Sequence, residues 1–170
     1  MFVTKEHAHE LGLASVRRFG PDCDQDHDFA TLYREHFPAL MRVAYLLTGS
    51  NEAAEDAVQD TFIRCRTKLA DLDQPRSYLR AALVNECRSV HRRSHREPAF
   101  TREPEPQLAT DLVELQDALA RLPWRQRTAI VLRYFADVSD PEIARMLRCR
   151  PVTVRSHIRR GIARLREVLT

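Results

Sequence analysis

Two adjoining segments decide the fold: "SDPEIARML" at residues 139–147 and, after the turn "RCR", "PVTVRSHIRRGIARLR" at residues 151–166. In the first segment Ser139 stands three residues before Glu142, the spacing of a helix-capping box, and a proline falls in the first turn. The second segment opens on Pro151, and proline is favoured at the first position of a helix. A short helix, a tight turn and a longer helix predict a helix-turn-helix motif.

The longer helix of this motif is amphipathic and basic. At about 100° per residue its apolar side chains fall within one sector. These inward residues are Val154, Ile158, Ile162, Leu165 and Leu169. Val152, Ser156 and Arg159 lie opposite, flanked by Arg155 and Arg160. A solvated arginine face, a membrane-surface helix and a helix in a DNA groove all fit this pattern alone. The apolar face holds no aromatic residue, which disfavours the membrane surface, and the capped helix before it favours DNA.

Composition predicts an all-α protein of the cytoplasm. The chain has 170 residues, a net charge of +3 and only 4 glycines, and it shows no alternating strand pattern. No apolar run approaches the roughly 20 residues of a membrane span, and the first residues lack the apolar core of a signal peptide. The 4 cysteines are scattered without a CxxC pair, which is typical of reduced thiols. We therefore expect no membrane association and no cofactor.

The helical patterns predict two small domains joined by a flexible linker. Residues 96–107, "REPAFTREPEPQ", hold three prolines among charges and read as the linker. The expected parts are an N-terminal extension at 1–27, a helical domain at 28–95 and a helix-turn-helix domain at 108–170. Three helices are expected in the first domain, at about 29–47, 51–69 and 75–95, and four in the second. Gly49 suits the end of the first of these helices, and Asn51 can cap the start of the next. Residues 1–27 end in the acidic, polar stretch "PDCDQDHD" and are predicted to be a disordered extension. Their scattered His7, His9, Cys23 and His27 match no tight metal spacing.

The expected helix at 51–69 has an unusual outer face. Its buried stripe is Ala54, Val58, Phe62, Cys65 and Leu69. The opposite face carries Asp56, Gln59 and Asp60 around an apolar Ile63. Negative charge near the helix start has a plain explanation in the helix dipole, but the dipole does not explain the exposed isoleucine. The pattern indicates a docking face for a basic partner helix.

The expected helix at 75–95 places an aromatic, an amide and arginines on one surface. Tyr78, Asn85 and Arg92 recur every seven residues, and Arg88 lies beside them. Such a surface suits unstacked single-stranded bases as well as duplex phosphates, although an ordinary polar helix face remains an alternative.

Two long stretches carry a family resemblance. "AAEDAVQDTFIRCRTKLADLDQPRSYLRAALVNECRSVHRR" resembles region two of bacterial sigma-70 family sigma factors of the extracytoplasmic-function (ECF, group 4) type. "ALARLPWRQRTAIVLRYFADVSDPEIARMLRCRPVTVRSHIRRGIARLRE" resembles region four of the same family. The resemblance covers about residues 28–168. "AYLLTG" and "VLRYF" are similar to the actinobacterial SigE-like subgroup.

The resemblance implies a transcription initiation factor with no catalytic residues and no metal site. Its partners would be core RNA polymerase, through the clamp of the largest subunit and the flap of the second-largest, and promoter DNA, duplex at −35 and single-stranded at −10. An anti-sigma factor is a further partner that the family suggests. The residues carried over for polymerase binding are Asp56, Gln59, Asp60 and Ile63. Those for the −10 element are Asp73, Gln74, Tyr78, Asn85, Arg88 and Arg92. Those for the −35 element are Arg148, Arg150, Thr153, Arg155, Ser156, His157, Arg159 and Arg160.

The turn of the helix-turn-helix departs from the family pattern. The family turn reads like "LGCSxGTVKS", whereas this chain has "LRCRPVTVRS". Arg148 stands at the turn glycine and Arg150 at the capping serine. Loss of the cap costs about 1 kcal/mol, which Pro151 partly offsets. We expect the two arginines to strengthen anchoring to DNA phosphates.

Two other classes of protein remain as alternatives. A stand-alone helix-turn-helix regulator would bind duplex DNA without polymerase, but it leaves the acidic docking face unexplained. A metal-dependent nuclease would use acids such as Glu52, Glu55 and Asp56, but these lie at a helix start without a histidine partner.

Overall fold

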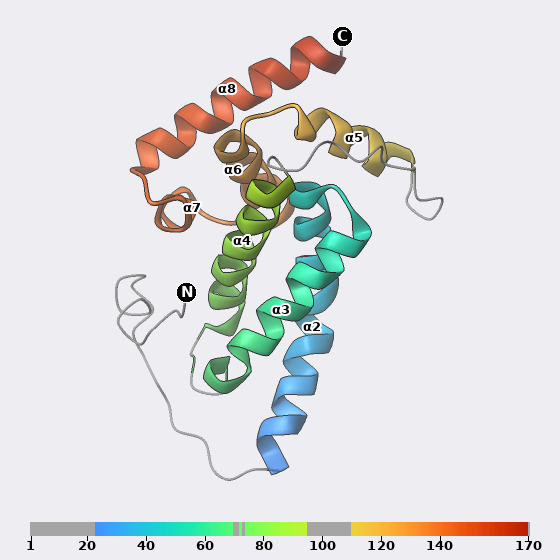
Figure 1. Ribbon diagram of the computed structural model, residues 1–170. Coiled ribbons are helices and arrows are strands. Elements are labelled where there is room, and N and C mark those ends of the chain that lie inside the picture. Colours follow the sequence, from blue (N-terminus) through green and yellow to red (C-terminus); the bar gives the residue numbers. More distant parts are fainter. Residues whose placement is uncertain (1–22, 70–71, 73, 95–109, 170) are drawn as a thin grey trace.

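The computed structural model describes residues 23–69, 72, 74–94 and 110–169, and within these ranges all regular secondary structure is α-helical. The helices are α2 (Cys23–Thr48), α3 (Asn51–Leu69), α4 (Pro75–Ser94), α5 (Thr110–Ala120), α6 (Trp124–Phe135), α7 (Asp140–Leu147) and α8 (Pro151–Leu169). Figure 1 shows α2, α3 and α4 running side by side, with α5–α8 gathered at one end of them. The expected all-α class is confirmed. None of the described helices is long and apolar enough to cross a membrane.

The first described helix begins earlier than the sequence pattern suggested. α2 starts at Cys23, whereas we expected disorder through residue 27 and a helix from about Phe29. The apolar spacing that marks a core-facing helix begins only at Phe29, so it misses this polar first turn and a half. Of the extension, residues 1–22 lie outside the described part of the chain.

The α2–α3 junction is built by a glycine and a serine. Gly49 has φ 80°, the left-handed conformation that ends a helix, as its position predicted. We expected Asn51 to cap α3, but Ser50 does so: its Oγ accepts a hydrogen bond from the backbone N–H of Ala53 at 3.1 Å. Asn51 is already the first helical residue. Both residue types cap helices well, so the pattern could not tell which of the two neighbours does so.

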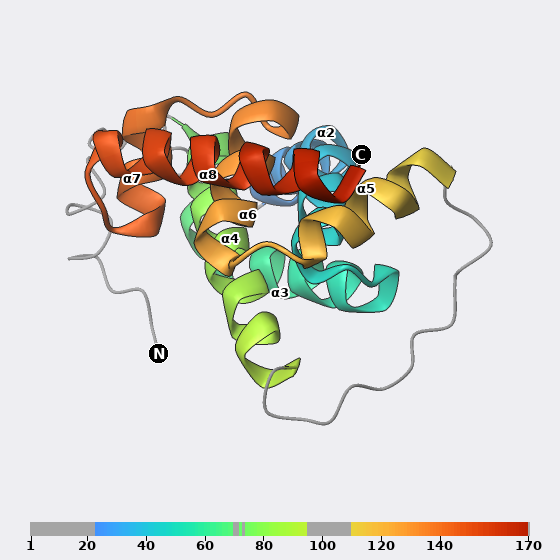
Figure 2. The same ribbon diagram turned by 90° about the horizontal axis from the view of Figure 1, so that it is seen from above.

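The two groups of helices share one hydrophobic core. Buried side chains of α2–α4, such as Leu47 and Leu83, belong to the same cluster as Leu119, Val131 and Ile143 from α5–α7. Figure 2 shows α6 between α8 and the N-terminal helices, and its main partner among the latter is α2. The two groups of helices that we expected as separate small domains are thus packed on each other, and the predicted linker at 96–107 lies outside the described part of the chain.

Hydrogen bonds to backbone carbonyls tie the groups to each other. The Arg127 guanidinium of α6 is buried and donates to the carbonyl of Leu47, in the last turn of α2, at 2.9 Å. It also donates to the carbonyl of Ala120, at the end of α5, at 2.7 Å. Arg80 of α4 donates to the carbonyl of Ala136 at 2.5 Å. The last carbonyls of a helix have no donor within their own helix, and the two arginine side chains supply the missing donors.

Candidate polymerase and promoter-binding surfaces

The outer face of α3 presents the residues expected to bind a partner helix. Ile63 is 71% exposed, the largest exposed fraction of any bulky apolar residue in the described chain. Asp56, Gln59 and Asp60 are exposed around it. Four residues of the inner stripe, Ala54, Val58, Phe62 and Cys65, are buried as predicted, and the side chain of Leu69 lies outside the described part.

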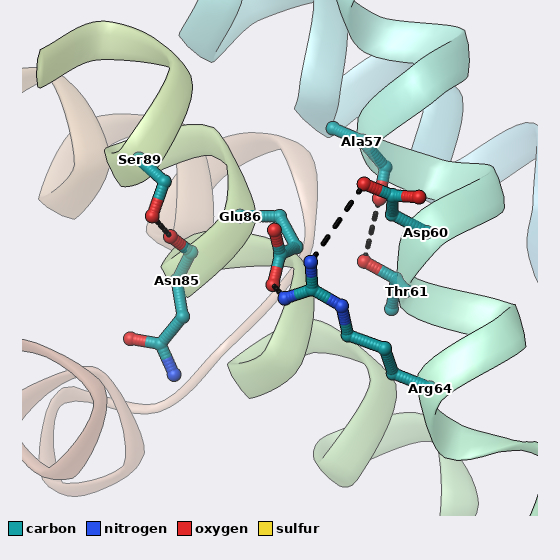
Figure 3. A network of polar contacts seen from close by, with 7 residues as sticks. All are labelled: Ala57, Asp60, Thr61, Arg64, Asn85, Glu86 and Ser89. Carbon is teal, nitrogen blue, oxygen red and sulfur yellow. Dashed lines mark hydrogen bonds and ion pairs between the residues drawn. The ribbon is translucent and has the colours of Figure 1, made fainter. Parts of the chain in front are cut away.

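A polar network fixes this face relative to α4. The Arg64 guanidinium forms an ion pair with Glu86 of α4 and lies 3.9 Å from the carboxylate of Asp60 (Figure 3). The Thr61 hydroxyl is buried and donates to the carbonyl of Ala57 at 2.7 Å. Asp60 therefore keeps its place on the surface with one weak cationic neighbour, and its carboxylate stays largely available to a partner.

The outer face of α4 carries part of the expected −10 surface. Asn85, Arg88 and Arg92 are exposed. In Figure 3 the Asn85 amide points away from the Arg64–Glu86 network, while its backbone carbonyl accepts a hydrogen bond from Ser89. Gln74, just before α4, is also exposed, whereas Asp73 lies outside the described residues.

Tyr78 corrects the expected composition of that surface. We placed it in one outward column with Asn85 and Arg92, but its side chain is 5% exposed and belongs to the core. Burial raises the pKa of its phenol. Tyr78 lies in the first turn of α4, and there its ring packs into the shared core although its spacing is that of an outward residue. In this arrangement its ring has no face free for a base.

The C-terminal helices lie next to this surface. Asn85 and Arg88 line a small crevice together with Trp124, Arg125 and Leu147. One turn further along α4, the His91 ring stacks on Trp124, with centroids 4.9 Å apart and planes at 24°. At the other end of α4, Ser77 donates to the Glu142 carboxylate at 2.7 Å.

That last contact replaces the predicted capping box. Ser139 is the N-cap residue of α7, but its side chain makes no capping hydrogen bond. Glu142, which should reach back to the cap, instead accepts the hydroxyl proton of Ser77, 65 residues earlier in the chain. The spacing of Ser139 and Glu142 therefore predicted the start of the helix correctly. It predicted the wrong partner for Glu142, because the hydroxyl of Ser77 competes for the same carboxylate.

The turn before α8 is a left-handed cap made without glycine. Arg148 has φ 51° and ψ 57°, and its N–H contacts the carbonyls of Ala144 and Arg145. A side chain in this conformation costs about 1–2 kcal/mol. The N–H groups of Thr153 and Val154 both reach the carbonyl of Arg150. Arg148 and Arg150 are exposed, so their guanidinium groups are available to phosphates.

The outward face of α8 matches the expected −35 surface in its arginines. Arg155, Arg159 and Arg160 are exposed, and Val152 is 63% exposed. Thr153 and Ser156 are half-buried, and the Ser156 hydroxyl donates to the carbonyl of Val152 at 3.1 Å. The inner face packs on α6, where Gly161 is so close that an added Cβ would lie 2.5 Å from Cδ1 of Ile130.

His157 points inward in part. Its Nδ1 is buried and has no hydrogen-bond partner among the described residues. Burial, followed by the charges of Arg125 and Arg160, lowers the pKa of its imidazole. We expected His157 on the DNA face, and its half-buried side chain has its Nδ1 edge covered by the protein.

Asp140 is the surface residue that sequence reasoning missed. Arg155 Nε donates to Asp140 Oδ2 at 3.0 Å. Asp140 is the first residue of α7, and the sequence offers no signal for this pair, since the residues lie on different helices separated by the turn. Within the described ranges no group of three or more histidine, cysteine, aspartate or glutamate residues could hold a metal ion.

Comparison with known proteins agrees with the two groups of helices. Residues 32–97 match the family model of sigma-70 region 2, and residues 112–165 match that of sigma-70 region 4. The ECF RNA polymerase sigma factor SigM of Mycobacterium tuberculosis is 31% identical over 150 residues, which are 83% of this chain and 76% of that protein. The ECF RNA polymerase sigma factor SigE of Mycolicibacterium smegmatis is 34% identical over 156 residues, covering 81% of this chain and 60% of that one.

Solved structures show the same arrangement. The sigma factor RpoE of Bartonella quintana, crystallised with the anti-sigma factor NepR, superposes with a TM-score of 0.70 at 28% identity, over 84% of this chain and 96% of that one. CnrH, solved with the cytosolic domain of CnrY, superposes with a TM-score of 0.66 at 27% identity, over 85% of this chain and 88% of that one. This chain belongs to the sigma-70 family, among the ECF RNA polymerase sigma factors, with region two in α2–α4 and region four in α5–α8.

Proposed function

We propose that this chain binds core RNA polymerase and directs it to promoters whose −35 duplex is read by region four and whose −10 element is read and opened by region two. The observation that carries the proposal is one chain with two different surfaces: an acidic face around an exposed Ile63 on α3 and an arginine face on α8. Sigma factors are non-enzymatic initiation factors, so phosphodiester synthesis belongs to the polymerase. We place the chain in the cytoplasm, where that polymerase acts.

Polymerase binding is assigned to α3. Ile63 would enter an apolar site on the clamp of the largest subunit, while Asp56, Gln59 and Asp60 pair with basic and polar groups around it. An exposed apolar centre within a charged rim is typical of protein interfaces. The flap of the second-largest subunit would contact region four.

The −10 element is assigned to Gln74, Asn85, Arg88 and Arg92, together with Asp73 from the α3–α4 connection. Capturing a base outside the stack costs a few kcal/mol, which these polar contacts and polymerase binding must supply. Tyr78 would join them only if the first turn of α4 rearranged.

The −35 element is assigned to α8 and the turn before it. Arg155, Arg159 and Arg160 are placed to reach base edges and phosphates, and Arg148 and Arg150 to anchor the backbone. Thr153, Ser156 and the outer edge of His157 complete the surface. An anti-sigma factor is a fitting further partner, since both superposed proteins were solved with another protein bound, and the one bound to the sigma factor RpoE is named an anti-sigma factor.

The test is promoter-dependent transcription by purified chain and core polymerase on a promoter library. Two exposed apolar residues provide a matched pair of variants. Ile63→Glu should abolish binding to core polymerase, whereas Val152→Glu should retain that binding and weaken promoter recognition. Absence of any specific transcript from an active core would reject the sigma function. If Ile63→Glu bound its DNA target unchanged and needed no polymerase, the chain would be a stand-alone regulator.

A further inference from the structure

The groove between α6 and α8 is lined by arginines and contains one acid. Its walls include Arg133 and Tyr134 of α6 and Arg155, Arg159 and Arg166 of α8. Asp140, at the start of α7, is the acidic residue among those lining it. A carboxylate here opposes the approach of phosphates to a surface otherwise suited to them. The dipole of α7 favours negative charge at this helix start, but its place beside the arginines calls for a further physical reason.

The contact with Arg155 supplies that reason. The Asp140 side chain is 20% exposed, whereas that of Arg155 is 72% exposed. The carboxylate is therefore held by the fold, and the guanidinium is the mobile partner. Asp140 accepts from Nε at 3.0 Å, so this contact leaves the two terminal nitrogens of the exposed Arg155 side chain unused.

An arginine held by Nε differs from a free one in what it can bind. A free guanidinium pairs with phosphates through any of its donors and in many rotamers. With Nε occupied, the terminal fork remains, and that fork matches the two acceptors on the major-groove edge of guanine. The negative charge of Asp140 also reduces the attraction of this side chain to any phosphate.

We propose that Asp140 is a specificity-determining positioning residue, which holds Arg155 for one base pair of the −35 element and weakens its binding to the DNA backbone. The proposal rests on the proposed function of region four as the −35 reader. It assigns to Asp140 no contact with DNA, so all of its effect passes through Arg155.

The experiment uses the full chain in holoenzyme with core polymerase. A promoter found by the library selection above serves as the reference, and every single base-pair substitution of its −35 element is bound over a series of KCl concentrations. The variants are Asp140→Ala, Asp140→Asn, Arg155→Ala and the double variant Asp140→Ala/Arg155→Ala. Asp137→Asn is the control for loss of one negative charge, because Asp137 is exposed and its φ of 51° suits asparagine.

We expect Asp140→Ala to reduce discrimination at one base pair by about tenfold, within the range of one bidentate contact. Arg155→Ala should reduce it at the same base pair, and the double variant should match Arg155→Ala alone. Asp140→Ala should also steepen the salt dependence of binding to unrelated DNA by about one phosphate contact. Asp140→Asn, which keeps the acceptor, should retain most of the discrimination while losing the charge effect.

Three outcomes would overturn the proposal while leaving the sigma function intact. Discrimination could stay within twofold of wild type in Asp140→Ala, the loss could add to that of Arg155→Ala, or Asp137→Asn could reproduce it. A wild-type holoenzyme that selects no promoter would instead remove the proposed function, and that result appears before any variant is made.

Discussion

Arg127 should determine whether the two regions unfold together. Its guanidinium is buried in α6 and reaches the last turn of α2 and the end of α5 through carbonyls at 2.9 and 2.7 Å. We consider Arg127→Met, which keeps much of the volume and removes all donors. The substitution leaves the Leu47 and Ala120 carbonyls without this partner.

The expected loss can be built from opposing contributions. Each hydrogen bond from a charged donor contributes about 1.5–3 kcal/mol, so two contribute about 3–6. Against this, burial lowers the pKa of the Arg127 guanidinium, and its Nε is buried without a hydrogen-bond partner among the described residues. An unsatisfied buried donor costs about 1–3 kcal/mol. The difference predicts a loss of roughly 2 kcal/mol in the free energy of unfolding.

Trp124 allows the loss of stability in Arg127→Met to be measured at the contact between the two regions. It is the only tryptophan of the chain and stacks on His91 across the contact between the regions. In urea, its fluorescence should follow separation of the regions, while far-UV circular dichroism follows the helices. With a slope of about 2 kcal/mol per molar urea, Arg127→Met should lower the fluorescence midpoint by about 1 M, and by more than the dichroism midpoint.

Arg125→Met is the matched control. Arg125 lies on the same helix, is exposed and has one long bond, to the Leu147 carbonyl at 3.4 Å. Its substitution should change the unfolding free energy by under about 0.5 kcal/mol. Equal midpoint shifts in the two variants, or an unchanged fluorescence transition in Arg127→Met, would refute the assignment of Arg127 as the tie between the regions.

Three further predictions concern region four and its pH response. Gly161→Ala should destabilise the chain by about 1 kcal/mol, because overpacking against Ile130 outweighs the gain in helix propensity. Ile130→Val removes the methyl group that clashes, so the double variant should lose less stability than the sum of the two single variants. If the shifts of the urea midpoint in the two single variants simply added, the close contact would be contradicted. Arg148→Gly should raise the free energy of unfolding by about 0.5–1 kcal/mol by removing left-handed strain, and a lower midpoint would show that this strain is not relieved. Burial, followed by the charges of nearby arginines, lowers the pKa of His157 below its usual 6.5 in the folded chain, so its contribution to stability is complete above about pH 6.5 and is lost as pH falls through the lowered value. His157→Gln should therefore flatten part of the fall in urea midpoint between pH 7 and pH 5, leaving the share of His36, whose pKa is lowered in the same direction; an unchanged slope would exclude His157 as its source.

The sequence predicted what depends on local pattern. Helical spacing placed Phe62 inside and Ile63 outside on α3, and the glycine at 49 marked the end of α2. Each of these follows from periodicity or from backbone freedom, which are properties of a few neighbouring residues. The same holds for the arginine face of α8.

The sequence failed where a distant partner decides. Tyr78 has the spacing of an outward residue, yet packing in the first turn of α4 buries it. Glu142 has the spacing of a capping box, yet it accepts from Ser77. The Asp140–Arg155 pair has no local signature, since both residues are ordinary members of their own helices.

The contact between the regions has a direct bearing on which surfaces are accessible. α3 packs chiefly against α2 and α4, whereas the C-terminal helices contact region two mainly through α2. The acidic face around Ile63 on α3 therefore remains open. The other face of region two is different, because Asn85 and Arg88 share a crevice with Trp124 of region four. In this arrangement, the surface proposed for polymerase is open on all sides, whereas the surface proposed for the −10 element is exposed but bordered by region four at this crevice. Arg127 and Arg80 hold the two regions together by hydrogen bonds to backbone carbonyls. Every residue has a backbone carbonyl, so the sequence does not indicate which ones accept, and the contact between the regions could be found only from the folded chain.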